Sequence, residues 1–98
     1  MHQSIHQKID GESGLTAFTR RVYHIVAEIP RGAVMTYAQV ARAIGKPKAV
    51  RAVGNALNRN PFAPAVPCHR VVRSDGMLGG FASGAAAKSH LLRKEGAL

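Results

Sequence analysis

Two apolar patterns of helical spacing, separated by a tight break, constrain the fold of this chain most. They predict one helix over 37–44, which Thr36 caps and Gly45 ends, and a second helix over 48–58. A helix, a short turn and a second helix are the spacing of a helix-turn-helix element. An ordinary helical corner fits the same spacing, so the faces of the second helix must help to decide between them.

The second predicted helix has two distinct faces. Val50, Val53 and Leu57 share an apolar inner face, whereas Arg51 and Asn55 lie on a basic and polar outer face. The interior glycine of this helix lowers helix stability by about 1 kcal/mol relative to alanine. We therefore expect a close backbone contact at that position, with a neighbouring helix or with DNA. The pattern favours a DNA-binding helix, although a solvated helix face remains the alternative.

Three further segments complete the predicted organisation. An apolar stripe predicts a helix before the pair, capped by Thr16 and stopped by Pro30. A proline-rich stretch over 60–67 cannot be helix interior, and a last helix is expected over 85–95. The stripe of the first helix is formed by Phe18, Val22, Ile25, Val26 and Ile29. We expect residues 1–14, which show no such pattern, to form a flexible arm, and 15–98 to form one domain.

Charge narrows the choice of partner. Fourteen Lys and Arg against five Asp and Glu give the 98-residue chain a net charge of +9. Such an excess favours a polyanion, either nucleic acid or an anionic membrane surface. No apolar run approaches the roughly 20 residues that cross a bilayer, and the first residues lack a signal core. Composition alone suits a ribosomal or chromatin-like basic protein equally well.

The single cysteine, Cys68, follows a proline and precedes His69 and Arg70. A lone thiol cannot form an internal disulfide, so a reducing, cytoplasmic environment is expected. A free thiol is only a few per cent ionised at neutral pH, and a nearby base raises its reactivity. Rigid positioning of the sulfur must contribute more than ionisation does. Taken alone, such a cysteine is more often a small buried apolar residue.

The sequence PCHRVV at 67–72 resembles the active-site motif of the O6-alkylguanine-DNA alkyltransferase family. Other segments match the same family in order. TYAQVA at 36–41 resembles its first DNA-binding helix, RAVGNA at 51–56 its recognition helix, and Asn60-Pro61 its hinge. Residues 79–81 and 88–96 resemble its substrate loop and closing helix. The resemblance is nearly continuous from Phe18 to Gly96.

The resemblance implies catalytic roles for five residues. Cys68 is the alkyl acceptor, and His69 takes the thiol proton through a water while Glu95 orients the imidazole. This order follows the nucleophile, base and orienter of hydrolytic triads. Tyr37 donates a hydrogen bond to the flipped guanine, and Asn60 fixes the turn that carries the cysteine. The reaction is stoichiometric and self-inactivating, and it needs no cofactor and no metal.

The resemblance also implies a DNA interface and a substrate pocket. Arg51 enters the base stack and fills the gap left by the extruded nucleotide, because a modified O6 atom is out of reach within the duplex. The other implied DNA-binding residues are Thr36, Ala52, Gly54, Asn55, Arg59 and Arg70. The implied pocket residues are Tyr37, Val71, Gly79, Phe81, Ala82, Ser83 and Lys88. The partner is double-stranded DNA that contains O6-alkylguanine, bound by a monomer in the cytoplasm or, in a prokaryote, at the nucleoid.

The expected fold is mainly α, an α-rich α/β, winged-helix-like domain with a helix-turn-helix and at most a short β-hairpin near Val71. The family's usual N-terminal domain is nearly absent, so a metal site in that domain is not expected. Phe81 stands where many relatives have tyrosine, and Ser83 replaces a common glycine.

One alternative function is a non-enzymatic lesion sensor, although such alkyltransferase-like proteins commonly carry tryptophan in place of the cysteine. The other alternative function is a helix-turn-helix regulator, which would leave Cys68, His69 and Glu95 without a role.

Overall fold

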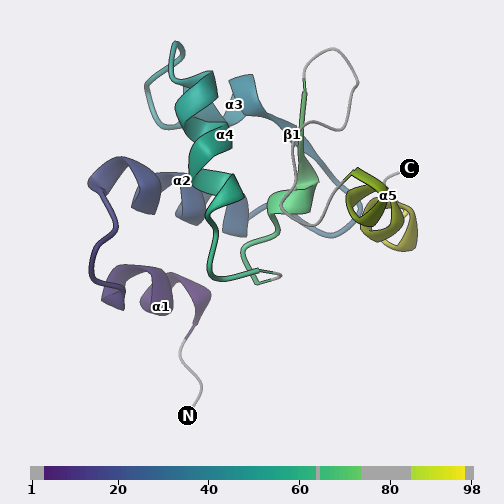
Figure 1. Cartoon of the computed structure of the whole chain (residues 1–98), viewed down its shortest axis with the longest axis horizontal. Helices are drawn as coiled ribbons and strands as arrows, with labels where there is room; N and C mark the ends of the chain where they lie inside the picture. The colour runs from purple at the N-terminus through teal and green to yellow at the C-terminus, as the bar shows by residue number, and fades with distance from the viewer. Residues whose placement is uncertain (1–3, 64, 74–84, 97–98) are drawn as a thin grey trace.

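The computed structural model describes residues 4–63, 65–73 and 85–96, and in them five α-helices surround an apolar core (Figure 1). Two short β-strands and one 3-10 turn, η1, connect these helices. The elements are α1 (Ile5–Gly11), α2 (Ala17–Ala27), β1 (Met35–Thr36), α3 (Tyr37–Ala43), α4 (Val50–Asn58), η1 (Cys68–Arg70), β2 (Val71–Val72) and α5 (Ala85–Lys94). The mainly helical architecture confirms the predicted fold class.

Side-chain caps begin α2 and α3 where the sequence predicts them. The Thr16 hydroxyl accepts a hydrogen bond from the backbone N–H of Thr19 at 3.0 Å. At the start of α3, the Thr36 hydroxyl accepts from the N–H of Gln39, and the Gln39 side chain accepts from the N–H of Thr36 at 2.8 Å. This reciprocal pair is a capping box and satisfies two otherwise unpaired donors. Gly45, with φ of +77°, follows the end of α3 in a conformation that favours glycine.

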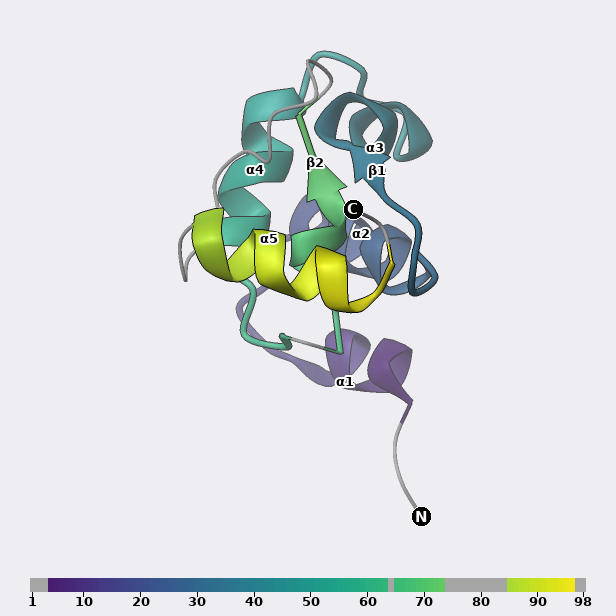
Figure 2. The ribbon, with the colours of Figure 1, turned by 90° about the vertical axis from the view of Figure 1, so that its right-hand side faces the viewer.

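The two strands come from distant parts of the chain and pair in parallel. Met35 lies opposite Val71, and Thr36 lies opposite Val72. The strand near Val71 therefore pairs in parallel with a segment on the other side of the helix-turn-helix, and not in the expected short hairpin, whose strands would be antiparallel. Figure 2 shows β2 beside β1, with α5 running across the molecule in front of η1 and β2. This pairing brings the start of α3 next to the turn that carries the cysteine.

The core lies between α2, α3, α4 and the segment that leads into β2. Its fully buried members include Val22, Val26, Val40, Ala41, Val53, Val66 and Val71. The hydroxyl of Tyr23 donates to the carbonyl of Ala56 at 2.7 Å and so ties α2 to α4 inside this core. Val50 was expected on the inner face, but it is 38% exposed because it is the first residue of α4 and lies beside the turn.

The N-terminal segment corrects one expectation. Instead of a flexible arm over 1–14, residues Ile5–Gly11 form α1, which packs on α2. Ile9 is fully buried, and Ser4 and Gln7 form a capping box at the start of the helix. An apolar anchor and a complete cap are enough to order a short helix against a neighbour. Of the helices in the described ranges, none combines the length and the apolar character needed to cross a membrane.

Candidate active site and DNA interface

Cys68 is held in a tight turn rather than in a strand. It begins η1 directly after Pro67, and its residue surface is 9% exposed. The backbone N–H of Cys68 donates to the carbonyl of Val66 at 2.9 Å, and that of Arg70 donates to the carbonyl of Pro67 at 2.9 Å. Backbone hydrogen bonds on both sides of the residue limit the positions that the sulfur can take. The turn thus presents the thiol in a defined direction, which a positioned nucleophile requires.

Asn60 supports this turn from the end of α4. Its side-chain amide donates to the carbonyl of Val66 at 2.8 Å, two residues before the cysteine. Its side-chain oxygen accepts from the backbone N–H of Phe62 at 2.9 Å. Asparagine commonly stabilises turns through such bonds to nearby backbone groups. The amide therefore links the helix-turn-helix to the segment that carries Cys68.

The imidazole of His69 lies against the carboxylate of Glu95. Its Nε2 atom is 3.0 Å from Oε2 of Glu95, and the two side chains are 4% and 9% exposed. The contact is outside the alignment of a hydrogen bond, and Nε2 has no hydrogen-bond partner among the described residues. Since the distance is already that of a hydrogen bond, a change in ring orientation alone would complete it. The carboxylate is close enough to stabilise an imidazolium through charge.

Arg70 holds the same carboxylate from the other side. Its Nε donates to Oε1 of Glu95 at 2.8 Å, its Nη2 donates to Oε2 at 2.5 Å, and its Nη1 donates to the carbonyl of Ile29 at 2.8 Å. Hydrogen bonds from Arg70 lower the pKa of the Glu95 carboxyl to about 2, against the opposing effect of burial, and His69 adds to the lowering. Glu95 is therefore ionised at neutral pH. The guanidinium was expected to contact DNA, but its donors are used inside the protein.

Lys88 links Tyr37 to Val71, on the segment that follows the cysteine. The ammonium of Lys88, whose residue surface is fully buried, donates to the carbonyl of Val71 at 2.5 Å and to the hydroxyl of Tyr37 at 3.4 Å. Burial lowers the pKa of Lys88 to about 8, and negative charge on Cys68 partly opposes this. Burial also raises the pKa of Tyr37, and the charge on Cys68 raises it further. Charge on Cys68 thus acts on both the phenol and the amine.

The outer face of α4 carries most of the predicted DNA-binding residues. Arg51, Ala52, Asn55 and Arg59 are exposed, whereas Thr36 is half-buried and caps α3. A methyl group added at Gly54 would lie 3.9 Å from Cε1 of Tyr37, which is ordinary van der Waals contact. The close backbone contact expected at this glycine is therefore not found within the described residues, where the nearest atoms belong to the side chain of Tyr37.

The structure brings the predicted catalytic residues into one region. Cys68 and His69 come from η1, Tyr37 from the start of α3, and Lys88 and Glu95 from α5 or the residue after it. The backbone carbonyl of Val71 accepts a hydrogen bond from Lys88 and so belongs to the same region. The positioning role of Arg70 was missed in the sequence, because its partners lie 25 and 41 residues away. The predicted pocket residues Gly79, Phe81, Ala82 and Ser83 lie outside the described residues.

A cavity of about 640 Å³ lies elsewhere, between α1, the end of α2 and β1. It is lined largely by apolar side chains such as Ile25 and Val34, together with His6 and His24, and it contains no predicted site residue. Within the described ranges, no three His, Cys, Asp or Glu side chains are grouped so that they could hold a metal ion. The cavity is therefore separate from the candidate active site.

Known proteins match this chain over most of its length. The model of the 6-O-methylguanine DNA methyltransferase, DNA binding domain, matches residues 17–97. A methylated-DNA–protein-cysteine methyltransferase of Methanosarcina acetivorans is 52% identical over 81 residues, which are 83% of this chain and 52% of the relative. The chain thus spans about half the length of this relative.

Two solved structures show the same fold. Mycobacterium tuberculosis OGT in complex with DNA is 43% identical with a TM-score of 0.81, over 84% of this chain and 51% of that chain. Schizosaccharomyces pombe Atl1, in complex with damaged DNA containing O6-carboxymethylguanine, is 37% identical with a TM-score of 0.72, over 81% of this chain and 75% of that chain. With the family model covering more than half of the residues, the chain belongs to the 6-O-methylguanine DNA methyltransferase family, in its DNA-binding domain.

Proposed function

We propose that this chain repairs O6-alkylated guanine in duplex DNA by moving the alkyl group onto Cys68 in a single turnover. The observation that carries this proposal is that Cys68 stands in one turn with His69 and acts by its charge on Tyr37 and Lys88. His69 makes a buried contact with the ionised carboxylate of Glu95. Tyr37 comes from α3 and Lys88 from α5, and the pKa values of both respond to charge on the cysteine. Membership of the family and 52% identity to a methyltransferase support the same activity.

The proposed reaction is a displacement at the alkyl carbon. The S–C bond to Cys68 forms as the bond from that carbon to O6 of guanine breaks, and the guanine leaves with the electron pair. The thiol proton passes through a water to His69. The carboxylate of Glu95 beside Nε2 favours a proton on that nitrogen, which leaves Nδ1 as the base. The thioether product is stable, so each molecule reacts once, and no cofactor or metal takes part.

Tyr37 and Lys88 act on the departing base in this proposal. A raised pKa keeps the Tyr37 phenol protonated at neutral pH, so it can donate a hydrogen bond to the guanine as charge develops. Lys88 lies within reach of the Tyr37 hydroxyl and supplies positive charge next to it. Both groups then stabilise charge that is larger in the transition state than in the ground state, which is what accelerates a reaction.

The helix-turn-helix of α3 and α4 binds the DNA in this proposal. The positive charge of the chain attracts phosphates without regard to sequence, as a search for damage requires. Arg51 inserts into the base stack when the damaged nucleotide swings out, which offsets part of the few kcal/mol that flipping requires. The small residues Ala52 and Gly54 allow the helix to approach a narrow groove. Residues 15–98 then form the family's C-terminal active-site domain, working as a monomer in the reducing cytoplasm.

The test is to incubate the protein with a duplex containing O6-methylguanine and to measure its intact mass and its affinity for the DNA. We expect a gain of one methyl group per molecule and no gain in Cys68→Ala, which still binds the duplex. Tight binding to the lesion with no mass change would instead identify a sensor. Equal binding to damaged and undamaged DNA, with a sequence preference, would identify a regulator.

A further inference from the structure

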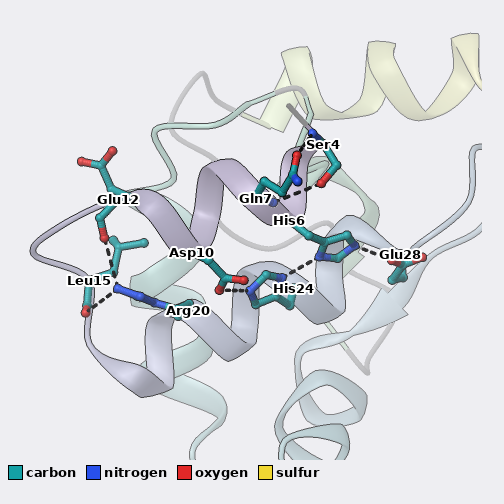
Figure 3. A network of polar contacts seen from close by, with 9 residues as sticks. All are labelled: Ser4, His6, Gln7, Asp10, Glu12, Leu15, Arg20, His24 and Glu28. Carbon is teal, nitrogen blue, oxygen red and sulfur yellow. Dashed lines mark hydrogen bonds and ion pairs between the residues drawn. The ribbon is translucent and has the colours of Figure 1, made fainter. Parts of the chain in front are cut away.

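A chain of four polar side chains joins α1 to α2 and its C-cap residue (Figure 3). Asp10 Oδ1 lies 2.7 Å from His24 Nε2, and His6 Nε2 lies 2.5 Å from Glu28 Oε1. Between them, Nδ1 of His6 and Nδ1 of His24 are 2.6 Å apart. The two ring planes are 15° from parallel and the ring centroids are 4.8 Å apart, so the rings meet edge to edge through these nitrogens. The order of the chain is therefore carboxylate, imidazole, imidazole, carboxylate.

The number of protons that these four side chains hold follows from the contacts between them. Each of the three contacts joins two atoms that bear lone pairs, so each needs one hydrogen between them. Two neutral imidazoles and two ionised carboxylates carry two hydrogens, and the two carboxylate contacts use both. The facing Nδ1 atoms of His6 and His24 would then repel each other at 2.6 Å. A third proton removes this repulsion, whichever of the atoms in the chain formally holds it.

The charged groups nearby do not replace that proton. On α2, Arg20 donates to the carbonyls of Glu12 and Leu15, at the far end of α1 from the two rings (Figure 3). On the segment after α2, Arg31 donates to the carbonyl of Lys94. Two more cations, Lys8 on α1 and Arg21 on α2, are exposed. Among the described residues, the ion pairs of Asp10 and Glu28 are those with the two histidines. The shared proton thus supplies the positive charge between the carboxylates.

We propose that His6 and His24 bind one shared proton and that this proton clamps α1 onto α2. The clamp also sets one wall of the 640 Å³ cavity, because both histidines and Glu28 line it. When α1 is undocked, each histidine meets water and holds a proton only below the ordinary histidine range near pH 6.5. Above about pH 6.5 the docked state therefore holds up to one proton more than the undocked state. By linkage, docking weakens as pH rises above that value, and it weakens again below it, where the two undocked histidines together bind more than one proton.

The clamp acts beside an apolar anchor that does not respond to pH. Ile9 is fully buried between the helices, and Ile5 is partly buried against the same core. Loss of the shared proton should therefore increase the fraction of molecules in which α1 is undocked, while the rest of the domain stays folded. Local opening of this kind is visible in amide hydrogen exchange, which reports the free energy of each segment separately.

The experiment measures exchange of the α1 amides, including that of Ile9, from pH 5.5 to 8.5 in the full chain without DNA. After correction for intrinsic exchange, protection of α1 is expected to fall by up to about tenfold per pH unit above neutrality, as the release of one proton dictates. His6→Gln should remove this pH dependence. The matched control, His90→Gln, changes an exposed histidine on α5 and should behave as the unchanged protein does.

A direct titration of the imidazole signals by NMR keeps the proposal testable if His6→Gln detaches α1 at every pH. We expect the signals of His6 and His24 to shift together, as one coupled proton step. Separate and independent steps would overturn the proposal. Protection of α1 that stays constant with pH in the unchanged protein would overturn it as well. Protection that rises with added Zn²⁺ and falls with a chelator would also overturn it, because a metal ion would then bridge the facing nitrogens.

Discussion

Arg70 donates hydrogen bonds to both carboxylate oxygens of Glu95, with Nε 2.8 Å from Oε1 and Nη2 2.5 Å from Oε2. The side chains of this pair are 16% and 9% exposed, so most of the contact is shielded from water. Two parallel bonds fix the plane of the carboxylate as well as its position. Arg70 thus places the charge that faces His69.

Removing this pair should affect both stability and transfer. Arg70→Ala leaves a buried carboxylate without its cation, which lowers the free energy of unfolding by about 3 kcal/mol. Arg70→Lys restores the charge without the two-point contact, so its loss should be intermediate. Chemical denaturation measures the loss, and Arg93→Ala, at an exposed arginine of α5, is the control. The rate of methyl transfer should fall in the same order. Equal stability of Arg70→Ala and the control would contradict the assignment.

Glu95 should make the stability of the domain depend on pH in acid. Its folded pKa of about 2 is lower than the ordinary value of 4.5 for a glutamate, so the carboxylate stabilises the fold above the unfolded pKa. That contribution, on the order of 2 kcal/mol, is lost as pH falls from about 4.5 toward 2. Unfolding free energies measured across this window in the unchanged protein and in Glu95→Gln test it. A pH slope that is the same in both proteins would argue that Glu95 is not held as described.

Lys88 should make the stability of the domain depend on pH in base. Its pKa of about 8 in the folded chain is lower than the ordinary value of 10.5 for a lysine, so the unfolded chain binds more protons between these values. Stability attributable to this group therefore rises as pH increases from about 8 to 10.5. Lys88→Met should remove that rise, whereas Lys94→Met, at an exposed lysine of the same helix, should retain it. Thermal unfolding at matched pH values measures the difference, and a rise that survives in Lys88→Met rules the prediction out.

Arg51 should matter for duplex DNA more than for the free base. In the proposed mechanism it fills the gap left by the flipped nucleotide, a role that free O6-alkylguanine does not need. Arg51→Ala should slow transfer from a duplex at least tenfold and leave transfer from the free base nearly unchanged. Arg21→Ala, at an exposed arginine of α2, is the matched control for lost charge. Equal slowing on both substrates would count against insertion.

Local patterns predicted much of this fold because local contacts make it. Thr36 begins α3 with a capping box, and Gly45 follows its end with a positive φ. Each of these signals can be read from four or fewer consecutive residues of the sequence. The helix α1 was missed because its apolar signal is only Ile5 and Ile9, one turn apart. The capping box of Ser4 with Gln7 was the signal that could have found it.

Long-range contacts could not be predicted in the same way. The parallel pairing of Met35 with Val71 joins segments on either side of the helix-turn-helix, and no periodicity of either segment specifies the other. The bonds of Arg70 with Glu95 likewise cross 25 residues, so the motif alone left Arg70 available for DNA. The catalytic set was assigned from the resemblance to a family, and the structure adds how Arg70, Val71 and Asn60 hold that set together.

The proposed function depends on the sulfur of Cys68 accepting an alkyl group. Peptide mapping by mass spectrometry, after incubation with a duplex containing O6-methylguanine, tests this most directly. We expect one methyl group per protein molecule, located on the peptide that contains Cys68, with an equal amount of unmodified guanine restored in the DNA. An unmodified Cys68 peptide, or a methyl group on any other residue, would contradict the account.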